Sequence, residues 1–286
     1  MSTQRVGRLV NSADGTRIWA DDAGNRAGIP VIFLHALACT SLVWDKQFCD
    51  ANLLQDLYMV RYELRGHGQS DHPLSSEAYT SQKYAEDFKA VCESFGIEKP
   101  FVCAWLSSAF IIVDIVDVYG PDQIAGVVYS GGPGISHFLH REIIHDHMKD
   151  KFPILRSTDG DDLPKAANVF VDSCFANPER DLPYENRLQW LAGFLMQAPT
   201  VRVNTVTRPQ SHARWETEFT PYKPHLLMHG VEDLHIDVRK VVPLTERVIP
   251  GIEVKLLDGV GHALAWEVPE KHNQYLLEFV KRHRDG

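Results

Sequence analysis

The sequence contains no long apolar run and no concentration of positive charge. No apolar stretch approaches the length of a membrane-spanning helix. The first ten residues, MSTQRVGRLV, lack the apolar centre of a secretory signal. Acidic residues outnumber basic ones, giving a formal net charge of −9, and no stripe of Lys and Arg occurs that could follow a phosphate backbone. We therefore expect a cytoplasmic protein that binds neither nucleic acid nor a membrane.

Cysteine is scarce and follows no recognisable spacing. The chain has five cysteines, an odd number, and most of them lie within apolar segments. This pattern indicates small buried residues with free thiols rather than a disulfide framework. Free thiols fit a reducing compartment such as the cytoplasm. The five are Cys39, Cys49, Cys92, Cys103 and Cys174.

Internal repeats and low-complexity tracts are also absent, and the chain instead alternates between strand and helix patterns. Short apolar runs bounded by turn residues predict strands. Segment 75–97 carries apolar residues at helical spacing and predicts a helix that ends at Gly96. Strands too apolar to alternate, with helices between them, predict an α/β fold whose mostly parallel central sheet is flanked by helices. The predicted strands are 16–20, 31–35, 58–64, 101–104, 126–130, 225–230 and 253–259.

The alternation stops between residues 133 and 220, where helical patterns occur with no obvious strand among them. Ligands of open α/β sheets bind outside the carboxyl ends of the strands, so a helical insertion leaving from those ends would cover the site. We therefore predict a core of residues 1–132 and 221–286 and a helical cap of residues 133–220. The three helical segments are 136–152, 163–175 and 185–198.

Four loops after predicted strands, and one sharp strand-to-helix turn, carry the residues suited to chemistry. The loops are HALA (35–38), RGHGQSD (65–71), HGVEDLHID (229–237) and GVGHALAWE (259–267), and the turn lies within FVCAWLSSAFIIVDIV (101–116). In order and spacing, over nearly the whole chain, these motifs resemble the α/β-hydrolase fold superfamily. The resemblance is strongest to its esterase, haloperoxidase and epoxide-hydrolase-like branch.

The resemblance implies an acid and a histidine in catalytic positions. Asp233, after the penultimate core strand, matches the family's acid, and His262, after the last strand, matches its base. In such a triad the acid fixes the imidazole tautomer, while the imidazole takes and returns a proton. The plain alternative for Asp233 is a turn residue that caps the next helix, but Asp237 is better placed for that capping.

The loops HALA and RGHGQSD are expected to support the site. The resemblance gives Leu37 a backbone N–H that helps to bind an oxyanion, while His35 more naturally braces the loop than transfers protons. Ala36 replaces the usual glycine, so the loop must avoid a positive φ there or tolerate strain. Arg65 and His67 are expected to be structural.

The strand-to-helix turn lacks an evident serine where the family keeps its nucleophile. The family's motif at this turn is G-x-S-x-G, with small residues two positions before and two positions after the nucleophile. Leu106 at the centre has small Ala104 and Ser108 as these neighbours, but leucine cannot attack a substrate. Ser107 offers a hydroxyl, but bulky Trp105 then falls two residues before it. A serine missing from the printed sequence between Trp105 and Leu106 would restore the family's GW-S-LGG and make the Leu106 N–H an oxyanion donor.

The histidines and aromatic residues of the predicted cap can be explained without a bound cofactor. Four histidines match no zinc spacing, so we expect surface histidines on a helix and no metal. Trp190 and Phe194 recur at helical spacing, as core residues do. Beneath a cap they could equally wall an apolar pocket, for which Trp105 and His35 are further candidates. The four histidines are His137, His140, His145 and His147.

These motifs predict a hydrolase of a carboxylic ester or lactone whose small-molecule substrate is largely apolar. A serine would be acylated, His262 would act as base and acid, and Asp233 would orient it, without metal or organic cofactor. One alternative is a lyase or cofactor-free oxygenase that needs only the His–Asp base. Another is a non-catalytic receptor or carrier on the same fold. Both a monomer and a homodimer fit the sequence.

Overall fold

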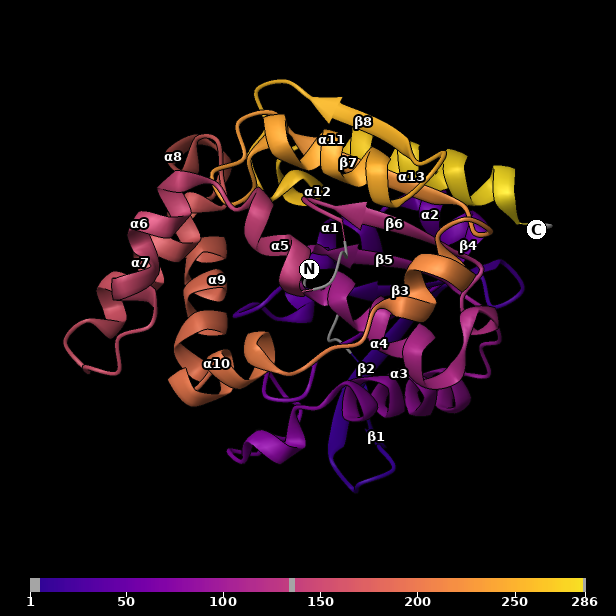
Figure 1. Ribbon diagram of the computed structural model, residues 1–286, viewed down its shortest axis with the longest axis horizontal. Coiled ribbons are helices and arrows are strands. Elements are labelled where there is room, and N and C mark those ends of the chain that lie inside the picture. The colour runs from indigo at the N-terminus through magenta and orange to yellow at the C-terminus, as the bar shows by residue number, and fades with distance from the viewer. Residues whose placement is uncertain (1–5, 134–136, 285–286) are drawn as a thin grey trace.

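An eight-stranded, mostly parallel sheet organises the molecule (Figure 1). The computed structural model describes residues 6–133 and 137–284. The strands are β1 (Arg8–Asn11), β2 (Arg17–Gly24), β3 (Ile29–Leu34), β4 (Leu57–Tyr62), β5 (Phe101–Trp105), β6 (Gly126–Ser130), β7 (His225–Gly230) and β8 (Glu253–Leu257). They lie in the order β1-β2-β4-β3-β5-β6-β7-β8, with the first two pairs antiparallel and the others parallel. The predicted fold class is confirmed.

Two hydrophobic cores, one on each face of the sheet, explain why the central strands are apolar throughout. The core helices and short 3₁₀ turns are α1 (Asp45–Phe48), α2 (Ala51–Asp56), α3 (Ser81–Phe95), α4 (Ala109–Tyr119), α11 (Val238–Val248), α12 (Leu264–Glu267), α13 (Pro269–His283), η1 (Ser41–Trp44), η2 (Ser76–Ala78), η3 (Leu106–Ser108) and η4 (Pro121–Gln123). Residues of α3, α4 and α11 form one core, and residues of α1, α2 and α13 form the other. Every residue of β4 and β5 is buried, so neither strand alternates. The helix predicted to end at Gly96 does so, at a φ of +64° that suits glycine.

Between β6 and β7 the described chain is mainly helical, in the segment that we interpret as a cap. Its helices are α5 (His137–Ile143), α6 (Asp146–Leu155), α7 (Leu163–Ser173), α8 (Pro178–Asp181), α9 (Tyr184–Met196), α10 (Pro199–Thr207) and the π-helix η5 (Trp215–Phe219). Figure 1 shows α6, α7, α9 and α10 standing beside the sheet. The division into core and cap stays a prediction.

Some elements differ from the sequence prediction. Segment 136–152, of which residue 136 lies outside the described residues, forms two helices rather than one. Ile144 forms a β-bridge with Ile236 of the loop after β7, and His145 caps α6 by accepting the His147 N–H. Strand β1 was not predicted, because only one of its four residues is buried. Helices α8, α10 and η5 were not predicted either.

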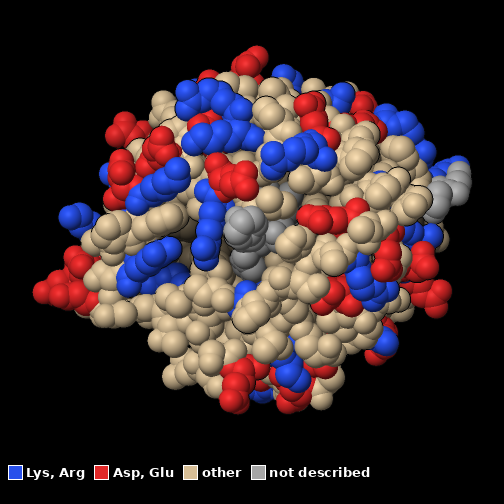
Figure 2. Space-filling model, in the orientation of Figure 1, with Lys and Arg blue, Asp and Glu red and all other residues tan. Residues whose placement is uncertain are grey.

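The surface carries both signs of charge. On the face drawn in Figure 2, Asp and Glu side chains are interspersed with Lys and Arg, and Lys and Arg side chains border a hollow on its left half. None of the described helices has the length and apolar character that crossing a bilayer requires. The five cysteines have free thiols, and all but Cys49 are buried, as predicted.

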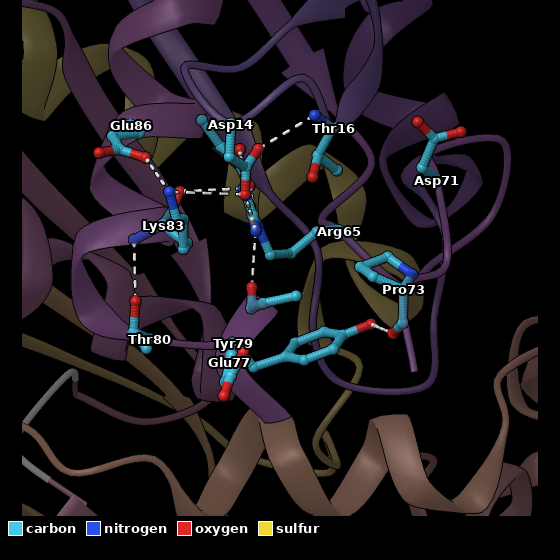
Figure 3. Close-up of polar contacts among 12 residues, drawn as sticks. Asp14, Thr16, Arg65, Asp71, Pro73, Glu77, Tyr79, Thr80, Lys83 and Glu86 are labelled. Carbon is cyan, nitrogen blue, oxygen red and sulfur yellow. Dashed lines mark hydrogen bonds and ion pairs between the residues drawn. The ribbon is translucent and has the colours of Figure 1, made fainter. Parts of the chain in front are cut away.

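A buried ion pair fixes the loop RGHGQSD. The Arg65 side chain is inaccessible to solvent and donates to both carboxylate oxygens of Asp87 on α3, at 2.7 and 2.6 Å. The same guanidinium donates to Asp14 at 3.1 Å and to the Ala78 carbonyl at 2.6 Å (Figure 3). These contacts support the structural role expected for Arg65.

Replacing Arg65→Met should destabilise the fold by about 3–5 kcal/mol, because the buried Asp87 carboxylate loses its partner. Urea unfolding at pH 7 measures the change. The control is Arg17→Met, which removes an exposed ion pair with Asp71 and should leave the unfolding midpoint nearly unchanged. Equal midpoints for the two variants would contradict this prediction.

Mild acid should destabilise the protein through its buried histidines. Burial lowers the pKa of eight histidines in the interior, and also that of half-buried His147. Near pH 6.5 the unfolded chain therefore binds protons that the folded chain does not bind. Below about pH 6.5, each should therefore remove up to about 1.4 kcal/mol of stability per pH unit. Burial raises the pKa of Glu267 to about 7, which opposes the trend with one proton. The eight are His35, His67, His140, His225, His229, His235, His262 and His272.

Urea unfolding at pH 7.5, 6.5 and 5.5 tests this prediction. His225→Phe removes one of the eight groups, and its stability should fall less steeply than that of the unmodified protein. Equal free energies of unfolding at the three pH values would show that the prediction is wrong.

Candidate active site

Asp233 and His262 come from different loops and meet in the interior. Asp233 follows β7 and His262 follows β8, and 2.7 Å separates Asp233 Oδ2 from His262 Nδ1. The other carboxylate oxygen, Oδ1, accepts the backbone N–H groups of His235 at 2.7 Å and Ile236 at 2.9 Å. The carboxylate can only accept, so His262 carries its proton on Nδ1 and presents Nε2 as a base.

Burial sets the protonation of this pair. Asp233 is 3% exposed and His262 is 1% exposed. Burial lowers the pKa of His262 to about 3 and raises the pKa of Asp233. The imidazole is therefore neutral at neutral pH, and its Nε2 makes no hydrogen bond with a described residue. A neutral imidazole with a vacant lone pair is competent to take a proton.

Two further histidines surround the acid. The His235 ring stacks on the His262 ring with centroids 4.2 Å apart, and its Nε2 lies 2.8 Å from Ser173 Oγ of α7. His229 Nε2 lies 3.7 Å from Asp233 Oδ2. Burial lowers the pKa of both histidines, so they remain neutral. The sequence analysis missed both, although His235 stands two residues after the acid in the same loop.

The sharp turn after β5 has Leu106 at its tip. Leu106 has a φ of +42°, in the left-handed region that leucine rarely adopts. A methyl group on Gly132 would lie 2.7 Å from Leu106 Cδ1, and one on Gly131 would lie 3.2 Å from His262 Nδ1. Leu106 and His262 therefore both border the turn that follows β6. Leu106 occupies the central place of the elbow in the structure, and the serine considered between Trp105 and Leu106 stays a prediction.

Ser107 lies one residue beyond the tip. Its Oγ accepts the Leu37 N–H at 2.6 Å, the N–H that the family resemblance assigns to an oxyanion. The neighbouring Ser108 is used differently, because its hydroxyl lies 2.9 Å from the Leu34 carbonyl and 3.0 Å from the Trp105 carbonyl. Ser107 is half-buried, whereas Ser108 is fully buried. Of these two serines, Ser107 is the one whose side chain is partly exposed.

The HALA loop is braced by histidines. The strain considered for Ala36 does not arise there, because the positive φ of the loop, +57°, belongs to Ala38. His35 Nδ1 lies 2.8 Å from the Ala36 carbonyl, and its Nε2 accepts the Leu64 N–H at 3.0 Å. His67 Nε2 accepts the Ala38 N–H at 3.3 Å. These contacts with the backbone support bracing by His35 and a structural role for His67.

A small aromatic cavity lies beside His262. Its volume is about 10 Å³, room for about one water molecule. The Trp105 ring lies 5.4 Å from the His262 ring, and Trp105 Nε1 donates to the His262 carbonyl at 3.1 Å. Of the residues predicted to line a pocket, Trp105 and Trp190 border this cavity, whereas His35 and Phe194 do not. The indole rings around it are Trp44, Trp105, Trp190 and Trp266.

The cap histidines differ from the prediction in one case. His140 on α5 was expected on the surface, but its Nδ1 is fully enclosed and its ring packs edge-on against Phe110 at 5.1 Å. Burial lowers the pKa of His140 to about 4, with a further contribution from His262. His145 caps α6, and the side chain of His137 lies outside the described residues. No three His, Cys, Asp or Glu side chains of the described chain could hold a metal ion together.

The sequence and the fold are similar to those of known hydrolases and haloperoxidases. Residues 31–273 match the alpha/beta hydrolase family. The chain is 26% identical over 288 residues to a non-heme chloroperoxidase of Streptomyces lividans, covering 95% of this chain and 99% of that protein. It is also 26% identical to the esterase RhEst1 from Rhodococcus sp. ECU1013, whose crystal structure covers 97% of this chain and 99% of its own at a TM-score of 0.86. The epoxide hydrolase VrEH1 from Vigna radiata, 20% identical, shares the fold at a TM-score of 0.75 over 99% of each chain.

Asp233→Asn should reverse the tautomer of His262. The two backbone N–H groups on Oδ1 fix the amide oxygen there, so the amide N–H₂ faces His262 and drives the ring proton to Nε2. Nitrogen NMR of the imidazole distinguishes the two tautomers. The control is Asp237→Asn in the same loop, where the side chain caps α11 instead. Finding the Nδ1–H tautomer in both variants would contradict the assignment.

Proposed function

This chain belongs to the alpha/beta hydrolase family, and we propose that it hydrolyses a small, largely apolar carboxylic ester or lactone by general-base catalysis without a nucleophilic side chain. One observation carries the proposal: Leu106 occupies the tip of the elbow while the buried Asp233–His262 pair is intact. Leucine cannot be acylated, so water becomes the attacking group.

The relatives and the aromatic side chains near His262 support the proposed substrate class. RhEst1 is called an esterase and is 26% identical to this chain over nearly its full length. The His262 ring is bordered by Trp105, and Trp190 packs against Trp105 at 5.5 Å. Aromatic side chains beside the histidine favour an apolar substrate.

The proposed reaction uses His262 twice. Nε2 takes a proton from water, whose oxygen attacks the carbonyl carbon, while Asp233 stabilises the imidazolium through Nδ1–H. The tetrahedral intermediate then collapses and its bond to the alcohol oxygen breaks. The imidazolium returns the proton to that oxygen, leaving the acid and the alcohol as products.

Acylation of Ser107 is the competing route. Its Oγ already accepts the Leu37 N–H, the group that would have to bind the carbonyl oxygen during attack. Trp105, two residues before Ser107, is also bulkier than the elbow allows at that position. One hydroxyl cannot both fill the oxyanion position and attack a carbonyl whose oxygen lies there.

A second candidate function uses the same base on a different substrate. In a lyase or cofactor-free oxygenase, His262 would deprotonate the substrate itself, and the presence of Leu106 favours this route equally. Products formed in ¹⁸O-labelled water distinguish the two, because ester hydrolysis places the label in the acid. Saturable binding of a small apolar molecule without any turnover would instead indicate a carrier.

Exchanging two residues should create a serine esterase. Leu106→Ser combined with Ser107→Leu places a serine at the tip of the elbow, where the family keeps its nucleophile. Hydrolysis of 4-nitrophenyl butyrate should rise at least about 100-fold. Intact mass after treatment with a fluorophosphonate should show one adduct at position 106 in the exchanged variant and none in the unmodified protein.

Two controls make this test specific. Ser107→Leu alone should remain unlabelled, and His262→Ala should remove the activity of both the unmodified and the exchanged protein. An adduct on Ser107 of the unmodified protein would contradict the proposal and support acylation of Ser107 instead.

A further inference from the structure

The hydroxyl of Ser107 is held by the backbone but leaves its own proton free. Oγ accepts the Leu37 N–H at 2.6 Å, and no described residue accepts a hydrogen bond from the Ser107 hydroxyl. Ser108 provides the contrast, since its hydroxyl proton is directed to the Leu34 and Trp105 carbonyls. A hydroxyl that accepts one hydrogen bond and donates none can donate its proton in a hydrogen bond to a bound molecule.

The position of this donor relates it to the base. Ser107 follows Leu106 at the tip of the elbow, and Leu106 contacts the Gly131–Gly132 turn that His262 also borders. A hydroxyl that accepts an N–H is polarised by it and donates more strongly to a developing negative charge. A ligand that accepts a hydrogen bond from Ser107 would therefore be linked to the Leu37 N–H through this hydroxyl.

We propose that Ser107 is a catalytic donor whose hydroxyl, fixed by the Leu37 N–H, binds the carbonyl oxygen of the substrate and stabilises its negative charge. The inference rests on the proposed function and changes the role of Ser107 from nucleophile to electrophilic donor. No bond forms to Oγ at any step, and its proton stays on it.

The experiment compares Ser107→Ala, Ser107→Thr and Ser108→Ala with the unmodified protein, using 4-nitrophenyl butyrate. Ser107→Ala should lower kcat about 100-fold with little change in KM, because the lost hydrogen bond strengthens in the transition state. Ser107→Thr keeps a hydroxyl and should restore most of kcat. Ser108→Ala should lower the thermal midpoint, with kcat largely retained.

A thiono substrate adds a measurement that a structural role would not affect. Sulfur accepts hydrogen bonds weakly, so the unmodified protein should prefer the oxygen ester of 4-nitrophenyl butyrate to its thiono analogue. Ser107→Ala should lose most of this preference, and Ser107→Thr should keep it.

The outcomes separate this inference from the function on which it rests. Full kcat in Ser107→Ala, together with loss of activity in His262→Ala, would overturn the donor role and leave general-base hydrolysis standing. Fluorophosphonate labelling of Ser107, or no turnover by the unmodified protein, would overturn both. An unchanged preference for oxygen over sulfur in Ser107→Ala would overturn the donor role alone.

Discussion

The contact between Asp233 Oδ2 and His262 Nδ1 joins loops 29 residues apart in the chain. It exists because β7 and β8 are parallel neighbours, which brings the loops at their carboxyl ends to the same edge of the sheet. Because the pair is buried, the carboxylate depends on the N–H groups of His235 and Ile236 rather than on water. The same loop contacts the helical segment between β6 and β7, because His235 Nε2 lies 2.8 Å from Ser173 Oγ of α7.

At the elbow, the backbone turn is formed although the side chain at its tip has no nucleophilic group. Leu106 keeps the left-handed φ that its position imposes, at a cost of about 1 kcal/mol for a residue with a Cβ. The turn joins two buried elements, since every residue of β5 and eight residues of α4 are buried. The site therefore combines a buried histidine and its carboxylate with an elbow whose central side chain has no nucleophilic group.

Elements with strong local patterns were predictable from the sequence. Seven of the eight strands were predicted, since each is a short apolar run between turn residues, and α3 was predicted to its end at Gly96. Strand β1 was missed because three of the four residues of this edge strand are exposed and it has no apolar run. The break between α5 and α6 was missed because it depends on pairing of Ile144 with Ile236, which no local pattern reveals.

The resemblance to the α/β-hydrolase family singled out Asp233 and His262, because each matches a family motif that follows a core strand. The sequence could not say that His235 would stack on His262, that His140 would turn inward, or that the Ser107 hydroxyl would accept the Leu37 N–H. These contacts join residues from separate elements. Their distances are set by how the sheet, the cap and the loops pack together, and packing is a property of the folded molecule rather than of any local stretch of sequence.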